Sequence, residues 1–476
     1  MITDIYPKIM ISLITVLVHN KMKGNYTIAI FIISLALSGF AIADETLFVN
    51  DLKRVFREAL SNTDFFPDDY CDSKFFTCND EKKIITIKFK DINLDGIHIP
   101  HSISTLTDLV SLYISNSTII IDEHFMGDLY KLRNSLKRLE ITNTKFETNL
   151  RLDGLNLIYL NLSCNNISQN LDNISFSKTL THIDLSDNKF HGDIKIFNDI
   201  PDLEVLYVVN KKVRLSFNNL TGNIPSFSNN INLAYLDLAS NILSGIIPDF
   251  SNNYNLKELD LAINRLSGII PDFSNNYNLK ELYLSFNNLT GNIPDFSNNI
   301  NLAYLDLASN ILSGIIPDFS NNYNLKELYL SFNNLTGNIP SFSNNINLTH
   351  LDLSKNNLSG TIPDFSKNYN LMGLYLSSNN LTGNIPDFSN NINLTHLYLS
   401  DNKLSGNIPD FSRNHALTKL NISYNKLSGN LPSFINNRAL YLLHLSKNYD
   451  FTYNCPGGKD IISPEQITNL ISWYTQ

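Results

Sequence analysis

The chain has 476 residues and a net charge of −9, from 36 basic and 45 acidic side chains. It contains no run of lysine or arginine, which argues against nucleic acid as a partner. Only 17% of the residues are charged, so Asn, Ser and Thr must supply most of the polar surface.

The N-terminal segment has the features of a secretory signal. Lys21 and Lys23 precede the apolar run Thr27–Ala43, which ends in the small-x-small sequence AIA. We expect residues 22–43 to be a signal peptide and residues 1–21 an upstream extension. The alternative is an uncleaved signal anchor, because the apolar run reaches the lower limit of a membrane span. The chain is thus expected to be secreted, with a membrane as partner only if Thr27–Ala43 stays uncleaved.

An N-terminal cap is expected over residues 44–83. Residues 46–60 carry apolar side chains at helical spacing, namely Leu52, Val55, Phe56 and Ala59. This spacing predicts a helix that covers the first unit of the array described below.

The four cysteines fit a secreted chain. Cys71 and Cys78 are close in sequence and precede the array, so we expect a local disulfide between them. Cys164 and Cys455 lie too far apart in a rigid array to meet, and both are expected to remain thiols. The cysteine spacing does not suit a metal site.

Repeated units fill the region 84–449, and from Leu233 onward each is 23 residues long. The sequence LAYLDLASNILSGIIPDFSNNYN occurs at 233–255 and again, letter for letter, at 302–324. Each unit follows LxxLxLxxNxLSGxIP and continues with DFSNN. Alignment gives about sixteen units, with these starts: Ile84, Leu109, Leu136, Leu157, Leu180, Leu203, Leu233, Leu256, Leu279, Leu302, Leu325, Leu348, Leu371, Leu394, Leu417 and Leu440.

This pattern is the leucine-rich-repeat signature. The LSGxIP continuation resembles the plant-type extracellular subfamily, as in receptor-like protein ectodomains and polygalacturonase-inhibiting proteins. The resemblance implies an α/β repeat solenoid, a right-handed superhelix with a parallel concave β-sheet and short or irregular convex segments. It also implies a non-enzymatic role and a partner that is a protein, a peptide or a cell-wall polysaccharide.

The spacing within the unit independently predicts what each position does. The leucines of LxxLxL alternate with outward residues, as in a strand. Asn at the ninth position both donates and accepts, so a buried ladder of these amides is expected to join neighbouring units. The ladder comprises Asn241, Asn264, Asn287, Asn310, Asn333, Asn356, Asn379 and Asn402. A phenylalanine spine is expected at Phe250, Phe273, Phe296, Phe319, Phe342, Phe365, Phe388 and Phe411.

The array is irregular near its start. Ile92, Ser117 and Thr144 stand where the ladder asparagine is expected. A unit that begins at Asn210 follows Leu203 after only seven residues, which indicates a recombination joint. Residues 215–259 and 284–328 differ at one position only, so a block of units was duplicated recently.

A C-terminal cap is expected over residues 450–476. The sequence Ser463–Gln466 is a capping box with proline at the first helical position, and Ile467, Leu470, Ile471 and Tyr474 form one face of a short helix. The family resemblance implies a cysteine pair in this cap, but only Cys455 is present.

The outward strand positions are the candidate ligand-binding site. The central position carries aspartates and tyrosines, and neighbouring strands would align them about 4.8 Å apart. Tyrosine offers flat apolar area and a hydroxyl, and it is enriched in recognition surfaces. The alternative is that a polar strand face was merely copied by duplication. The candidates are Asp237, Asp260, Tyr283, Asp306, Tyr329, Asp352, Tyr375 and Tyr398.

An enzymatic role is not expected. Asp237 and Asp260 could approach the carboxylate separation of a retaining glycosidase. The face is open, however, and we expect no pocket that would raise the pKa of one carboxyl. The sequence lacks a nucleotide-binding glycine motif, HExxH and a nucleophile elbow, so no catalytic residue, cofactor or metal is expected.

Asn-x-Ser/Thr sequons mark candidate glycosylation sites, and five of them share one position just after the ladder asparagine. The candidates are Asn116, Asn166, Asn219, Asn288, Asn334, Asn357 and Asn380. Together these features predict an extracellular recognition module. The alternative is a structural or adhesive surface protein whose repeats supply length and glycosylated bulk.

Overall fold

The structure, a computed structural model, describes most of the repeat array and parts of both ends. The regions predicted as a signal peptide (22–43) and as a C-terminal helix lie outside the described residues. Those described are 45–56, 69–92, 96–208, 218–449, 451–455 and 458–462.

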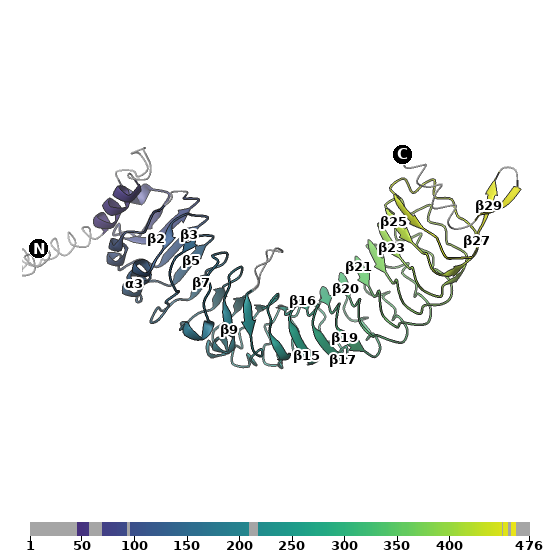
Figure 1. The fold of residues 1–476 in the computed structure, drawn as a ribbon, viewed down its shortest axis with the longest axis horizontal. Helices are drawn as coiled ribbons and strands as arrows, with labels where there is room; N and C mark the ends of the chain where they lie inside the picture. The colour runs from purple at the N-terminus through teal and green to yellow at the C-terminus, as the bar shows by residue number, and fades with distance from the viewer. Residues whose placement is uncertain are drawn as a thin grey trace, which may run out of the picture.

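The chain winds into an arc-shaped solenoid (Figure 1). Each turn, here called a coil, contributes one strand to a sheet of seventeen described strands. β1 (Phe76–Cys78) pairs antiparallel with β2 (Ile84–Lys90), and from β2 onward the neighbours are parallel. The others are β3 (Ser111–Ser115), β5 (Arg138–Thr142), β7 (Tyr159–Asn161), β8 (His182–Asp184), β10 (Val205–Tyr207), β12 (Tyr235–Asp237), β14 (Glu258–Asp260), β16 (Glu281–Tyr283), β18 (Tyr304–Asp306), β20 (Glu327–Tyr329), β21 (His350–Asp352), β22 (Gly373–Tyr375), β23 (His396–Tyr398), β25 (Lys419–Asn421) and β28 (Leu442–His444).

The inner side of the arc carries this sheet, while β15, β17 and β19 lie on the outer side (Figure 1). The expected parallel concave sheet is thereby confirmed, as are short segments outside it. These are β4 (Ile120–Ile121), β6 (Lys145–Phe146), β9 (His191–Asp193), β11 (Asn219–Thr221), β13 (Ser244–Ile246), β15 (Arg265–Ile269), β17 (Asn288–Asn292), β19 (Ile311–Ser313), β24 (Ser405–Gly406), β26 (Lys426–Leu427), β27 (Gly429–Asn430) and the 3₁₀ turns η1 (Tyr70–Asp72), η2 (His101–Thr105), η3 (Leu171–Asn173) and η4 (Lys195–Asp199).

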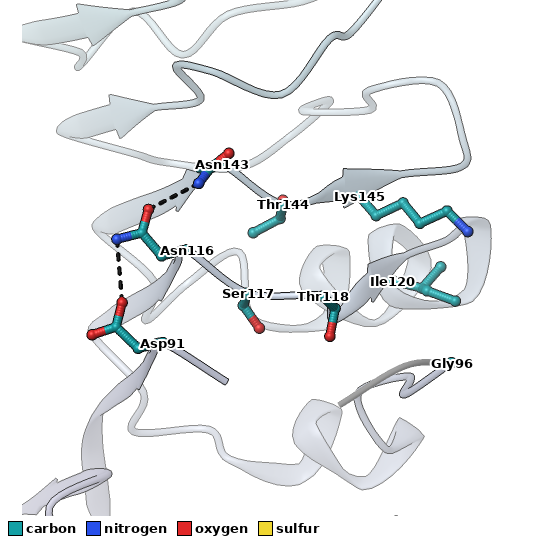
Figure 2. A pocket seen from close by; sticks show the side chains of 9 residues that line it. All are labelled: Asp91, Gly96, Asn116, Ser117, Thr118, Ile120, Asn143, Thr144 and Lys145. Carbon is teal, nitrogen blue, oxygen red and sulfur yellow. Dashed lines mark hydrogen bonds between the residues drawn. The ribbon is translucent and has the colours of Figure 1, made fainter. Parts of the chain in front are cut away.

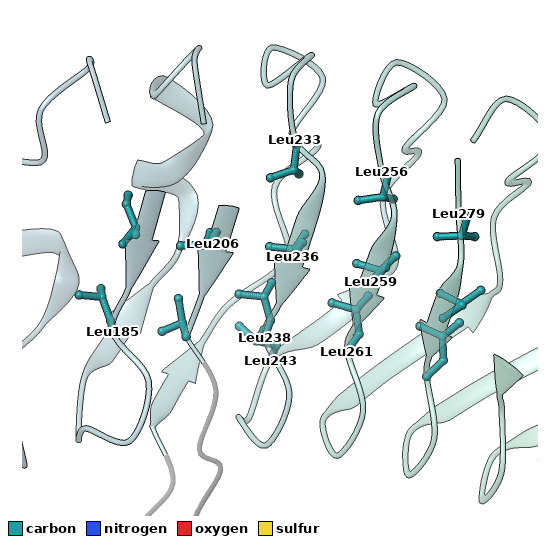
Figure 3. Packing of buried hydrophobic residues seen from close by; sticks show 14 of the residues in the cluster. Leu185, Leu206, Leu233, Leu236, Leu238, Leu243, Leu256, Leu259, Leu261 and Leu279 are labelled. Atoms are coloured by element: carbon teal, nitrogen blue, oxygen red, sulfur yellow. The ribbon is translucent and has the colours of Figure 1, made fainter. Parts of the chain in front are cut away.

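The strand leucines form the core, stacked coil upon coil (Figure 3). Leu236, Leu259 and Leu282 occupy the same register on three successive strands and are completely buried. The phenylalanine spine is also confirmed. Phe250 and Phe273 are fully buried, and successive rings in the spine lie 6.3–6.5 Å apart from Phe227 to Phe434. Both layers repeat every coil, so the core is continuous along the arc.

The ladder asparagines join the coils as expected. Asn287 Nδ2 donates to the Leu261 carbonyl of the preceding coil at 2.9 Å, and Oδ1 accepts from the Leu266 amide at 2.9 Å. In the early coils, Ser117 Oγ instead donates to the Ile92 carbonyl at 2.9 Å. Thr144 Oγ1 donates to Asn165 Oδ1 at 2.9 Å, so the irregular positions are still tied to the ladder.

A second asparagine ladder was missed in the sequence. Asn276, in the DFSNN segment, is fully buried, and its amide donates to the carbonyls of Phe250 at 3.0 Å and Asn253 at 2.9 Å. The same bonds recur from Asn253 to Asn437. From Asn253 to Asn437, two amide ladders therefore bond each coil to the preceding one.

Among the described residues, the expected unit at Asn210 adds no strand to the concave sheet and contributes only β11 outside it. β10 pairs directly with β12, with Val205 opposite Tyr235. Leu203 thus begins one long coil that ends before Leu233, and the buried Asn218 belongs to it.

A helix over residues 45–56 lies within the predicted N-terminal cap, and its Leu52 and Phe56 are buried, whereas the rest of the predicted helix, residues 57–60, lies outside the described residues. The predicted Cys71–Cys78 disulfide is present, with the Cα atoms 5.7 Å apart. Cys164 is outside any disulfide, and its thiol lies 3.4 Å from Asp187 Oδ2.

Two elements were not predicted. The helix α3 (Glu123–Lys131) fills the outer side of an early coil, capped by Asp122. At the other end, β29 (Phe451–Cys455) and β30 (Gly458–Ile462) form an antiparallel hairpin, with β29 also paired to β27. The described part of the C-terminal end is therefore extended chain.

Candidate functional site

The eight candidate residues lie in one row across the concave sheet. Asp237 is the strand partner of Asp260, which partners Tyr283, and the register continues coil by coil to Tyr398. We call these eight residues the central row. A flanking row lies two residues earlier on each strand: Tyr235, Glu258, Glu281, Tyr304, Glu327, His350, Gly373 and His396.

The aspartates of the central row also hold the chain where it leaves each strand. Oδ1 of Asp260 accepts from the Ala262 amide at 2.9 Å, and Asp306 does the same for Ala308 at 3.0 Å. Asp237 is only 7% exposed. The carboxylates are therefore less available to a ligand than their outward strand positions suggest.

Burial also perturbs these carboxyls. Desolvation raises the pKa of Asp260 to about 6, with Glu258 and Asp306 adding to the rise and the Ala262 amide opposing it. The pKa of Asp306 is raised for the same main reason. The expectation that an open face leaves every carboxyl pKa unraised was wrong, because neighbouring rows of side chains cover the strand.

The tyrosines of the central row are oriented by hydrogen bonds. Tyr283 donates its hydroxyl to Glu281 Oε2 at 2.9 Å, and Tyr329 donates to Glu327 Oε2 at 2.7 Å. Burial and these carboxylates raise the pKa of both tyrosines. Both phenols therefore stay protonated over the physiological range and present neutral rings beside negative charge.

Farther along the arc the surface becomes an aromatic cluster. The rings of Tyr375 and Tyr398 are stacked with centroids 5.4 Å apart, and His396 lies 6.3 Å from Tyr375. Gly373 makes room for this cluster, since a Cβ there would lie 2.8 Å from ring atoms of both His350 and Tyr375. Gly373 was missed in the sequence, although it breaks a row otherwise made of large side chains.

A second aromatic group lies at the opposite end of the concave face and was also missed. Lys88, Tyr113, Arg138, Tyr159 and His182 come from β2, β3, β5, β7 and β8, in that order. We call these five residues the N-terminal stack. The Arg138 guanidinium lies 3.4 Å from the centroid of the Tyr159 ring, and that ring stacks on His182 at 5.8 Å.

All seven candidate glycosylation asparagines are exposed. Asn334 and Asn357 lie on adjacent coils, with Asn357 Nδ2 donating to Asn334 Oδ1 at 2.6 Å. Their exposure satisfies the steric requirement for modification.

A shallow cavity of about 780 Å³ lies beside the early coils, off the central row (Figure 2). Figure 2 shows that Asn116 bridges two neighbours at its edge. Its amide donates to Asp91 Oδ1 at 3.2 Å, and its Oδ1 accepts from Asn143 at 3.0 Å. The cavity therefore overlaps a candidate glycosylation site and not the candidate ligand-binding residues.

Within the described residues, no group of three His, Cys, Asp or Glu side chains is placed to hold a metal ion. No helix in that part of the chain combines the length and apolarity of a membrane span.

Protein-family models of leucine-rich repeats match several segments of the array. The Leucine Rich Repeat model matches residues 232–253, 255–276, 278–300, 301–322, 370–392, 393–414 and 416–437. A two-copy Leucine Rich repeats model matches 323–368, and a further Leucine Rich repeat model matches 176–194. No curated protein matches the chain.

Several solved structures share the fold. The ectodomain of the plant membrane receptor kinase GASSHO1/SCHENGEN3 from Arabidopsis thaliana, in complex with CASPARIAN STRIP INTEGRITY FACTOR 2, is 31% identical over 76% of this chain, with a TM-score of 0.59. The plant peptide hormone receptor RGFR1, in complex with RGF2, is 29% identical over 75%, with a TM-score of 0.55. The chain spans 50% and 66% of these two chains, respectively.

A bacterial structure also matches. The leucine-rich-repeat protein LIC12759 of Leptospira interrogans is 24% identical over 80% of this chain and 93% of its own, with a TM-score of 0.56. At that identity the likeness concerns the fold alone.

Proposed function

We propose, from the premise that this chain is a leucine-rich-repeat solenoid, that it is an extracellular, non-enzymatic recognition module. Its partner is a peptide or protein that binds across the concave face. The central and flanking rows form the binding surface. The seven exposed sequons lie outside the strands of the concave sheet and carry glycans away from the binding surface.

The observation that carries this proposal is the unbroken alignment of the two rows. Strand pairing places Tyr283 directly beside Asp260 on one side and Asp306 on the other. Tyrosine rings, carboxylates and histidines then continue to the Tyr375–Tyr398 stack. Such a surface offers both flat apolar area and hydrogen-bonding groups to an extended ligand.

The solved structures support a peptide or protein as partner. One neighbour is a plant peptide hormone receptor in complex with RGF2, and another is bound to an integrity factor. The comparisons lend no support to a cell-wall polysaccharide, the other ligand that the sequence suggested. A ligand that runs across the sheet, perpendicular to its strands, would contact a new coil about every 4.8 Å.

A glycosidase role is not favoured, although Asp260 has a raised pKa. Asp237 and Asp260 each accept a backbone amide two residues on, which fixes both carboxylates in the turn that ends their strand. Their positions thus have a structural cause that repeats in other coils. We therefore assign these carboxylates to the fold and to the binding surface.

The structural or adhesive alternative rests on the recent duplication. Identical blocks at 215–259 and 284–328, apart from one position, lengthen the array without changing its surface chemistry. An adhesive spacer would tolerate such changes in repeat number. The proposed recognition role instead requires particular side chains at particular coils.

The test compares two matched variants of the full chain on an array of short peptides and secreted proteins. One variant carries Tyr283, Tyr329, Tyr375 and Tyr398 changed to serine. The control carries the same change at Tyr254, Tyr277, Tyr323 and Tyr369, which are 53–55% exposed and lie outside the sheet. Selective binding that only the first variant loses supports the proposal. Absence of selective binding, or equal loss in both variants, contradicts it.

A further inference from the structure

The N-terminal stack differs in charge from the acidic middle of the concave face, β12 to β20. We propose that it is a binding surface for an acidic peptide segment, held by Arg138 and Lys88 and flanked by the rings of Tyr113, Tyr159 and His182. This inference rests on the proposed recognition function and names one part of the ligand that the concave face takes.

The stack alternates cations and rings over five successive strands. Lys88 Nζ lies 5.7 Å from the centroid of the Tyr113 ring, and the Arg138 guanidinium lies 5.6 Å from the same ring. Arg138 also stacks on Tyr159 at 3.4 Å, and Tyr159 stacks on His182. Each ring thus holds a cation or another ring in place, so the charges are presented in fixed positions.

Arg138 keeps most of its hydrogen-bonding capacity for a ligand. A guanidinium has five N–H donors, yet the Arg138 side chain forms no hydrogen bond among the described residues. Its nearest carboxylate is Glu140 Oε2, at 3.9 Å from Nη2. Because Tyr159 covers one face of the planar group, a ligand carboxylate can approach the Nη atoms in the plane and bind in bidentate fashion.

The balance of charge favours an acidic ligand at the stack and disfavours one over the middle of the concave face. From β2 to β8 the outward strand positions carry three cations, Lys88, Lys90 and Arg138, against Glu140 and Asp184. From β12 to β20 the two rows carry six carboxylates: Asp237, Glu258, Asp260, Glu281, Asp306 and Glu327. An extended ligand that spans both regions must therefore change its charge along its length, acidic at the stack and not acidic over β12–β20.

The dimensions suit a short extended peptide. Five adjacent strands span about 19 Å at about 4.8 Å each, which is the length of about six extended residues. The Tyr159 and His182 rings offer flat apolar area, so an aromatic side chain between the acidic ones would add contact. The ligand segment is therefore a peptide in which glutamate or aspartate alternates with tyrosine.

The experiment uses the full chain and three fluorescein-labelled probes, with binding followed by fluorescence anisotropy. The probes are a short peptide of alternating glutamate and tyrosine, its lysine–tyrosine counterpart, and oligo(dT). The test variant is Lys88→Gln with Arg138→Gln. The control is Lys367→Gln with Arg413→Gln, which removes two exposed positive charges from the outer loops.

We expect the acidic peptide to bind wild type and the control alike, and the test variant about tenfold more weakly, as the loss of charge-assisted hydrogen bonds predicts. Tyr159→Leu, which keeps both charges, weakens binding because Arg138 loses the ring that positions it. Unchanged melting temperatures show that the variants are folded.

Three results overturn the inference: equal loss in test and control variants, equally tight binding of the lysine peptide, or tighter binding of oligo(dT) through Lys88 and Arg138. The last would assign the stack to nucleic acid. The tyrosine-to-serine variant of the central row still binds the acidic peptide with wild-type affinity, because that row lies outside β2–β8. Failure of this inference is thereby separable from failure of the proposed function.

Discussion

The hydroxyl of Tyr283 donates to the carboxylate of Glu281, two residues earlier on the same strand, at 2.9 Å. Tyr329 and Glu327 repeat the relationship two coils farther on, at 2.7 Å. Each bond fixes a large ring and a charge together on the concave face before any ligand arrives. A surface held in this way loses less side-chain entropy on binding, which favours affinity.

The ladder asparagines are expected to dominate the stability of the array. Asn287→Ala removes the amide that bonds to the Leu261 carbonyl and leaves buried backbone groups unpaired. We expect a loss of about 3 kcal/mol, seen as a lower midpoint in chemical denaturation. Asn288→Ala, at the exposed neighbouring position, is the control and should cost less than about 0.5 kcal/mol. Equal costs would contradict the ladder's role.

One exposed isoleucine lies in strained backbone. Ile263 has φ of 56°, in the left-handed region that β-branched residues rarely adopt, and it is 47% exposed. Ile263→Asn should therefore raise stability by about 1 kcal/mol. The control is Ile246→Asn, which is 65% exposed and lies outside that region. A gain in melting temperature at both positions, or at neither, would count against backbone strain as the cause.

The raised pKa of Asp260 predicts how stability depends on pH. Its pKa is about 6 in the folded chain, whereas the ordinary value for an exposed aspartate is 3.8, so the native state binds the proton more tightly than the unfolded chain does. Stability is then greatest below about pH 4 for this group and falls as pH rises through about 6.

Asp260→Asn should remove that dependence while it keeps an oxygen for the Ala262 amide. We expect the variant to be more stable than wild type at pH 7.5 by about 1 kcal/mol, and the gain to vanish at pH 4. Thermal unfolding at both pH values checks this. Asp318→Asn, on an exposed outer loop, is the control, and an equal gain there would show a general charge effect.

Glycans should be found on the exposed flank in a host that performs N-glycosylation. Asn288, Asn334, Asn357 and Asn380 follow the ladder position in coils that present them to solvent. Mass spectrometry of the secreted chain before and after enzymatic deglycosylation measures their occupancy. Unmodified asparagine at all four sites would contradict the proposed glycosylated flank.

Much of the architecture could be predicted because each position of the repeat occurs many times in the sequence. The leucines, Asn287 and Phe250 recur at a fixed spacing, and a buried, stacked environment is what an apolar or amide position of this kind indicates. Asn276 recurs just as regularly, but an Asn-Asn pair after Phe-Ser is typical of an exposed turn. Nothing in the pair reveals which of the two amides turns inward.

The binding surface could be predicted only in part. Alternation along each strand placed the central row correctly, but not the burial of Asp260, which depends on side chains from neighbouring coils. The Arg138–Tyr159 stack lies where the repeat spacing is irregular, so the sequence does not indicate which residues of neighbouring strands lie side by side there. For α3, Asp122 as cap and Phe125, Met126 and Leu129 as an apolar face were signals in the sequence.

The concave-face proposal is tested most directly by placing one glycan on either side of the solenoid. Asp352→Asn creates the sequon Asn-Leu-Ser in the central row, whereas Asp318→Asn creates Asn-Phe-Ser on an outer loop. Each is the same single substitution, and mass spectrometry confirms that the new site is occupied.

The measurement is the affinity of each glycosylated chain for the peptide or protein that wild type selects. The account predicts that the glycan at position 352 abolishes binding, that the glycan at 318 leaves it intact, and that deglycosylation restores it. Undiminished binding with an occupied glycan at 352 would contradict the account.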